Sequence, residues 1–188
     1  MSSLQERKLR QLYEFYLKNG FSSSAEEIAE ALGISQRTIF NRYKTLENLK
    51  KEVLNYWRFS FYERIEARLP LCNNDVEKLL YFIYELKRSS RNEPDFFRIE
   101  SNTGGFLQNN PGSFIEMTTK ILEKGISNAS FEIGYDLETF AIYLLFNIIY
   151  LYILQKQDTT IILFLLLPIL TDAGKEEIES LDLNDFLE

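Results

Sequence analysis

The chain has 188 residues, 45% of them hydrophobic and 26% charged, which excludes an intrinsically disordered protein and leaves room for a small domain beside a larger one. The net charge of −7 is unevenly spread, because residues 1–53 hold nine Lys or Arg against seven Asp or Glu, whereas residues 54–188 hold twelve against twenty-one. Only the N-terminal part is therefore suited to approach a polyanion.

The absence of histidine removes several kinds of site at once. With none in the chain, Ser-His-Asp and Cys-His catalysis and histidine-based zinc sites are excluded. No other residues have a catalytic spacing, so we predict that the protein is not an enzyme and holds no metal and no cofactor. The single cysteine, Cys72, excludes an internal disulfide, and the N-terminus lacks the apolar core of a signal peptide, so we expect a cytoplasmic protein.

The first predicted helix runs from about Leu4 to Lys18, where apolar residues recur at helical spacing, and Asn19-Gly20 ends it. A helix-turn-helix pattern follows from Ser22 to Lys44. Ser24 with Glu27 forms a capping box for a short helix, and Gly33 supplies the turn that ends it.

The second helix of this pattern is expected to present, on its outward side, residue types that bind DNA. Ser35 caps it, and Ile39 and Tyr43 point inward. The outward residues include three cations and no acid. Arg binds guanine bidentately, Gln and Asn bind adenine in the same way, and the remaining cations suit phosphates. The outward set is Gln36, Arg37, Thr38, Asn41, Arg42 and Lys44.

The order of residues in this pattern resembles the N-terminal domain of TetR-type transcriptional repressors. The resemblance covers about residues 5–53 and rests on the runs IAEALGIS and TIFNRYK with Glu47 and Leu49. It implies a dimeric, ligand-responsive repressor with a helical C-terminal domain. Phe40 stands where the family usually has a tyrosine that contacts a phosphate, and Leu46 stands where many members have a lysine. With Ser24 and Phe40 added to the outward residues above, the set predicted to bind DNA is complete.

From Thr45 to Leu69 the sequence predicts one helix of about 25 residues, stopped by Pro70, which joins the two domains. We therefore predict an all-α protein. A three-helix DNA-binding domain occupies residues 1–53, and a helical effector-binding and dimerisation domain occupies residues 54–188.

The body is predicted to be a set of helices with one mobile loop. Residues 101–113, rich in Gly, Asn and Pro, are expected to form that loop. The last two long helices are apolar nearly all round, so we assign them to a homodimer interface that includes Leu166. The predicted helices cover residues 74–90, 95–100, 114–127, 136–155 and 159–170, and the acidic tail from Lys175 is expected to end in a peripheral helix.

Aromatic residues of the linking helix and the body are candidates for an apolar pocket that binds a small effector. The candidate residues are Trp57, Phe61, Phe82, Phe97, Phe106, Tyr143, Phe146 and Asn147. Ordinary core packing is the other explanation of such residues. For Tyr143, Asn147 and Tyr150, which form one column, the polar partners are either a ligand or the same groups across a two-fold axis.

These features together predict a sequence-specific DNA-binding regulator. We expect a repressor that is released from a near-palindromic operator by a small, largely apolar ligand. The alternative is a helical carrier or sensor of hydrophobic molecules that does not bind DNA.

Overall fold

The computed structural model describes residues 3–108, 113–154 and 159–182, and every regular element in these ranges is a helix apart from one isolated bridge between Phe131 and Leu170. The predicted all-α class is confirmed. Contacts divide the chain into two compact units, Met1–Arg64 and Ile65–Glu188. This division falls later in the chain than the boundary expected after residue 53.

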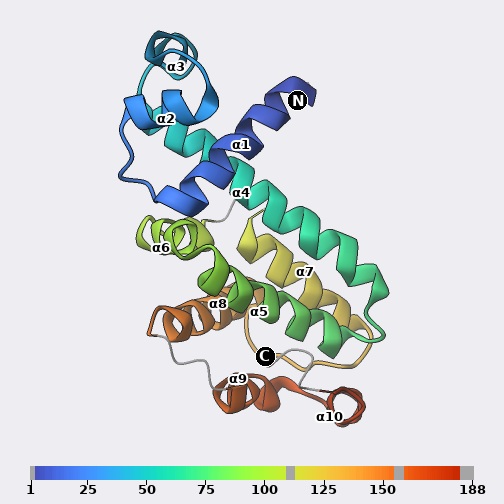
Figure 1. Ribbon diagram of the computed structural model, residues 1–188. Helices are drawn as coiled ribbons and strands as arrows, with labels where there is room; N and C mark the ends of the chain where they lie inside the picture. Colours follow the sequence, from blue (N-terminus) through green and yellow to red (C-terminus); the bar gives the residue numbers. More distant parts are fainter. Residues whose placement is uncertain (1–2, 109–112, 155–158, 183–188) are drawn as a thin grey trace. The chain divides into compact units, whose positions relative to one another are not determined.

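Three short helices and most of a long fourth one form the first unit (Figure 1). Helix α2 contacts both α1 and α3. The buried side chains at the centre of the unit are mostly aliphatic, together with the aromatic residues Tyr16, Tyr43, Trp57 and Phe61. The elements are α1 (Ser3–Asn19), α2 (Ala25–Leu32), α3 (Gln36–Tyr43) and α4 (Leu46–Arg68).

Residues next to its two ends determine where helix α4 begins and where it stops. The Thr45 hydroxyl accepts a hydrogen bond from the backbone N–H of Asn48 at 3.1 Å, which satisfies one free donor of the first turn. At the other end Pro70 lies within the 3₁₀ helix η1 (Leu69–Leu71), because its ring cannot continue an α-helix. The single helix α4 therefore contributes residues to both units.

The second unit is built on α5, α7 and α8, which contact one another in every pair (Figure 1). Helix α5 is capped by Asn74, whose side-chain oxygen accepts from the N–H of Glu77 at 2.7 Å. The elements are α5 (Asp75–Asn92), α6 (Pro94–Asn102), η2 (Gly105–Leu107), α7 (Phe114–Ser127), α8 (Leu137–Ile153), α9 (Thr159–Leu166), η3 (Leu167–Ile169) and α10 (Asp172–Glu179).

Much of the stretch expected to be a mobile loop forms helical structure, since α6 reaches Asn102 and η2 covers Gly105–Leu107. Gly104 has a φ of 68°, which favours glycine, and it leads into η2, where Phe106 is buried. A Cβ on Gly105 would lie 2.2 Å from a carboxylate oxygen of Glu100, so this backbone is in close contact with α6. The prediction was therefore wrong for residues 101–108, and residues 109–112 lie outside the described ranges.

Helix α10 is joined to the rest of the second unit by one carboxylate. Glu177 accepts a hydrogen bond from the Ser130 hydroxyl at 2.6 Å and another from the backbone N–H of Val76 at 3.2 Å. The second bond satisfies a free donor at the start of α5. Gly174 lies so close that a Cβ would be 2.2 Å from the Ser130 carbonyl oxygen. Helix α10 thus packs against α5.

None of the helices that the structure describes combines the length and the apolar character needed to cross a bilayer.

Candidate nucleic-acid interface

Helix α2 is held by the predicted capping box. The Ser24 hydroxyl accepts from the N–H of Glu27 at 3.3 Å, and the Glu27 carboxylate accepts from the N–H of Ser24 at 2.7 Å. These two bonds favour the charged carboxylate and lower the pKa of Glu27. The hydroxyl hydrogen of Ser24 is not used in the box, so this exposed side chain can still donate to a phosphate.

The turn between α2 and α3 fixes the angle between these two helices. Gly33 adopts a left-handed conformation with a φ of 64°. The N–H of Ile34 then donates to the carbonyl of Ala29 at 3.0 Å. This pattern is typical of a glycine that ends a helix.

Helix α3 is anchored on its inner side and capped at its start. Ile39 and Tyr43 are buried, as predicted. The N–H of Thr38 donates to the Ser35 hydroxyl at 3.1 Å, and the two hydroxyl oxygens lie 2.9 Å apart. Thr38 is therefore partly used in the cap, which reduces what it can offer to DNA.

Three side chains on the outer side of α3 are not used within the protein. Gln36, Arg37 and Asn41 are all exposed, and none has a side-chain hydrogen bond or ion pair among the described residues. These residue types are the ones that bind the edges of guanine and adenine in the major groove. The helix thus presents uncommitted donors and acceptors from its first turn to its middle.

The two cations at the end of α3 are held by the protein itself. The Arg42 guanidinium lies 5.1 Å from the ring centre of Tyr43, and Lys44 donates to the carbonyl of Asn41 at 2.9 Å. Burial raises the pKa of the Tyr43 hydroxyl, while the charge of Arg42 opposes that rise. Both cations keep unused donors and sit as positive charges beside the reading residues, which suits phosphate contacts.

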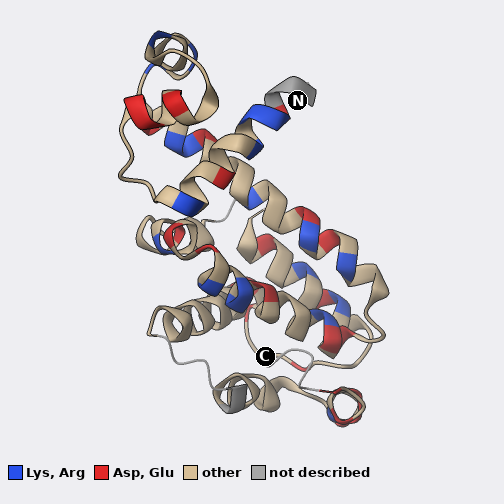
Figure 2. Cartoon of the chain, viewed as in Figure 1, with Lys and Arg blue, Asp and Glu red and all other residues tan. Residues whose placement is uncertain are grey.

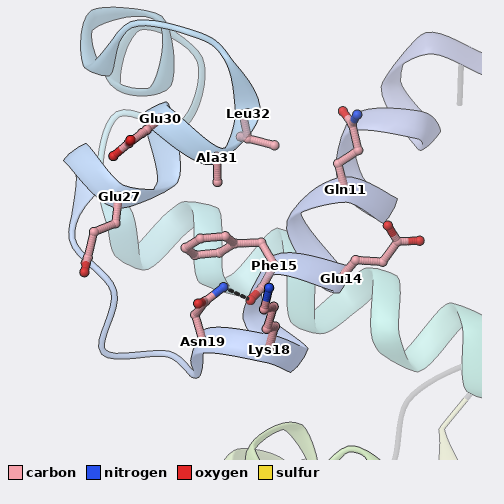
Figure 3. Close-up of a pocket in the computed structure, with 9 residues that line it drawn as sticks. All are labelled: Gln11, Glu14, Phe15, Lys18, Asn19, Glu27, Glu30, Ala31 and Leu32. Atoms are coloured by element: carbon pink, nitrogen blue, oxygen red, sulfur yellow. Dashed lines mark hydrogen bonds between the residues drawn. The ribbon is translucent and has the colours of Figure 1, made fainter.

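Charge distinguishes α3 from α2. In Figure 2, α3 carries Lys and Arg and no acid, whereas α2 carries acids. A groove of about 550 Å³ between α1 and α2 is lined by three carboxylates and one ammonium (Figure 3). These groups belong to Glu14, Glu27, Glu30 and Lys18. The groove is therefore unsuited to phosphate, whereas α3 carries cations and no acid.

The predicted ligand residues are divided between the two units. Trp57 and Phe61 are fully buried on α4 in the first unit, with ring centres 6.2 Å apart. Phe82, Phe97 and Phe106 are buried in the second unit. The eight residues are thus divided between two units and, within the second one, between core and surface.

A compact aromatic cluster in the second unit includes two of the predicted ligand residues, Phe97 and Phe106. The ring centres of Phe97 and Phe106 are 4.8 Å apart, and those of Phe106 and Phe114 are 4.6 Å apart. Tyr152 lies 6.4 Å from Phe97 and donates its hydroxyl hydrogen to the carbonyl of Ile83 at 3.1 Å. The sequence analysis missed Phe114 and Tyr152, since nothing in a helical repeat shows which rings of different helices will meet.

Tyr143 and Phe146 lie at the surface of α8 in the single chain, and Asn147 follows Phe146 in the sequence. Tyr143 and Phe146 are 54% and 55% exposed, and the Asn147 amide donates to the carbonyl of Tyr143 at 2.7 Å. The amide thus finds its partner in its own helix. The Phe146 ring lies parallel to that of Tyr150, with centres 6.2 Å apart.

Large apolar residues are exposed on α9 as well as on this side of α8. Phe164 on α9 is 72% exposed, whereas Leu166, predicted to be at the interface, is fully buried in its own unit. The choice of Leu166 was therefore wrong, because its side of α9 faces the core. We call the exposed residues the α8–α9 surface: Tyr143, Phe146, Tyr150, Ile153, Leu154, Ile161, Phe164 and Leu167.

Comparison with known proteins bears on the fold. No family model and no curated protein matches the sequence. The ketosteroid transcriptional regulator KstR2 of Mycobacterium tuberculosis has a similar structure, with a TM-score of 0.62 and 14% identity over 92% of this chain and 97% of that one.

Two further structures show the same likeness. The TetR family transcriptional regulator PfmR from Thermus thermophilus has a TM-score of 0.53 and 19% identity over 78% of this chain and 84% of its own. AibR, solved in complex with isovaleryl coenzyme A and operator DNA, has a TM-score of 0.54 and 15% identity over 78% and 84% of the two chains. These likenesses establish the arrangement of the helices.

Proposed function

We propose that this chain, which has the fold of TetR-type transcriptional regulators, is a sequence-specific DNA-binding regulator and acts as a repressor. The observation that carries the proposal is the outer side of α3. There Gln36, Arg37 and Asn41 are exposed and uncommitted, and no acid accompanies them. A capped helix of this kind enters the major groove with its N-terminal residues toward the bases.

The test is selection of binding sequences from random double-stranded DNA, followed by variants of α3. Arg37→Ala should reduce discrimination between sites, because each lost base contact is worth about 1–3 kcal/mol. Lys44→Ala should weaken binding to all sequences similarly and lower the slope of the salt dependence by about one. Arg98→Ala, which removes an exposed arginine of the second unit, is the matched control and should leave affinity unchanged.

The outcome of the selection also separates the two functions under consideration. Enrichment of a defined sequence that Arg37→Ala no longer prefers would support the regulator. A protein that enriches no sequence, yet retains apolar small molecules on purification, would be the carrier or sensor instead.

We further propose a homodimer formed through the α8–α9 surface. Eight large hydrophobic residues are exposed there in the single chain, a concentration that in a stable protein is usually covered by a partner. A second copy fits because a two-fold interface pairs the same surface on both subunits. Two copies of α3 would then read two half-sites about 34–36 Å apart, and the operator would be a near-palindrome.

The effector in this proposal is a small, largely apolar ligand of the second unit. The supporting observation is the aromatic cluster of Phe97, Phe106, Phe114 and Tyr152, because sites for such ligands are lined mostly by hydrophobic and aromatic side chains. AibR was solved with isovaleryl coenzyme A, in which only the acyl group is apolar, so small compounds that carry the isovaleryl group are first probes for this chain.

Helix α4 is the proposed route of coupling, since it contributes residues to both units. A ligand shifts a conformational equilibrium only by its differential affinity for the two states, and couplings are typically about 1–3 kcal/mol, or about 5- to 150-fold. By reciprocity, operator DNA would weaken ligand binding by the same factor. The emission of Trp57, the one tryptophan, allows the titration with and without operator. Equal ligand affinity in the titrations with and without operator DNA would contradict this coupling.

A further inference from the structure

Phe40 is the one large apolar residue on the outer side of α3. Its side chain is 41% exposed, whereas Ile39 and Tyr43 of the same helix are buried. Gln36 and Arg37 precede it by four and three residues, so both are its neighbours on the helix surface. An aromatic ring thus lies directly beside two of the three uncommitted reading side chains.

The chemistry of this ring limits what it can recognise on DNA. A phenyl group has no hydrogen-bond donor or acceptor, so it can neither donate to a phosphate nor bind the polar edge of a base. The apolar group that the major groove displays is the C5-methyl of thymine, and aromatic side chains are among those that contact it. Neighbours on a helix that enters the groove reach adjacent bases.

We propose that Phe40 determines specificity by packing against the 5-methyl group of one thymine in each half-site. This inference rests on the proposed DNA-binding function. The methyl group, rather than the hydrogen-bonding edge, is the feature that is read, so thymine should be preferred over uracil at that position. The neighbouring Gln36 and Arg37 would read the polar edges beside it.

The test uses duplexes of the sequence enriched in the selection, with each thymine replaced in turn by deoxyuridine. This replacement removes only the methyl group and keeps the base pair. The wild-type protein should lose affinity at one thymine position per half-site, by about fourfold for each methyl removed. Phe40→Ala should bind the thymine and uracil duplexes with equal affinity, while Phe40→Tyr, which keeps the ring, should retain the difference.

A second measurement separates the methyl group from the base pair that carries it. At the sensitive position the T·A pair is replaced by C·G or by 5-methylcytosine·G. The wild-type protein should prefer the methylated duplex, and Phe40→Ala should not. Circular dichroism tests whether Phe40→Ala and Phe40→Leu are folded. If Phe40→Ala is unfolded, Phe40→Leu takes its place, and it should keep only part of the preference for the methylated duplex.

The outcomes distinguish this inference from the function on which it rests. Failure to enrich any sequence would overturn both. An enriched sequence that the wild-type protein binds equally with thymine or uracil at every position would leave the regulator intact and overturn the role of Phe40. Retention of the uracil effect in folded Phe40→Ala would show that another residue contacts the methyl group, and would also overturn it.

Discussion

Replacing Phe164 by aspartate should separate the proposed dimer into monomers. The ring is 72% exposed in the single chain, and a phenylalanine side chain buries on the order of 200 Å², so a partner would cover about 140 Å² of it. At about 25 cal/mol per Å² this burial stabilises the dimer by about 3.5 kcal/mol per copy, or about 7 kcal/mol for both copies, as an upper limit. A loss of that size raises the dissociation constant by up to about five powers of ten.

The assay is light scattering coupled to gel filtration at micromolar concentration. The wild-type protein should elute as a dimer and Phe164→Asp as a folded monomer. The matched control is Tyr135→Asp, because Tyr135 is 82% exposed but lies outside the α8–α9 surface, so this variant should remain dimeric. The monomer should also bind an operator with two half-sites no more tightly than one with a single half-site.

Two results would refute this reasoning. A wild-type protein that is folded but monomeric at micromolar concentration would exclude the proposed interface. A dimer that persists in Phe164→Asp would show that the contact lies elsewhere, since a buried unpaired carboxylate cannot be tolerated at its centre.

Three further predictions concern stability, measured by chemical denaturation. The Tyr16 hydroxyl is buried with no hydrogen-bond partner among the described residues, so Tyr16→Phe should stabilise the first unit by about 1 kcal/mol. Burial raises the pKa of Tyr16 and of Tyr81 to about 12 in the folded state, so the contribution of these two tyrosines to stability should be constant below pH 10 and fall as the pH rises from 10 to 12; the fall should be less steep in Tyr16→Phe. Gly174→Ala should destabilise the second unit by about 1–3 kcal/mol, because its Cβ would meet the Ser130 carbonyl, whereas Gly134→Ala, where a Cβ meets nothing within 4 Å, should be nearly neutral.

The sequence by itself determined the local structure of the first unit almost completely. Ser24, Gly33 and Ser35 act on the backbone within a few residues, through caps and a left-handed turn, and the structure shows each of them in the predicted role. The side of α3 that faces outward follows from the spacing of two buried residues. Such local interactions are readable because they depend little on the rest of the chain.

Only the tertiary structure decided the arrangement of the body. Helices α8 and α9 are apolar nearly all round, so periodicity could not show that Leu166 faces the core while Phe164 faces outward. The meeting of Phe97, Phe106 and Phe114 depends on how three separate elements pack. Likewise, the Gly-rich stretch after α6 is ordered by the close approach of Glu100, a contact that composition cannot reveal. These features depend on side chains from different helices, and their packing is settled only when the helices come together.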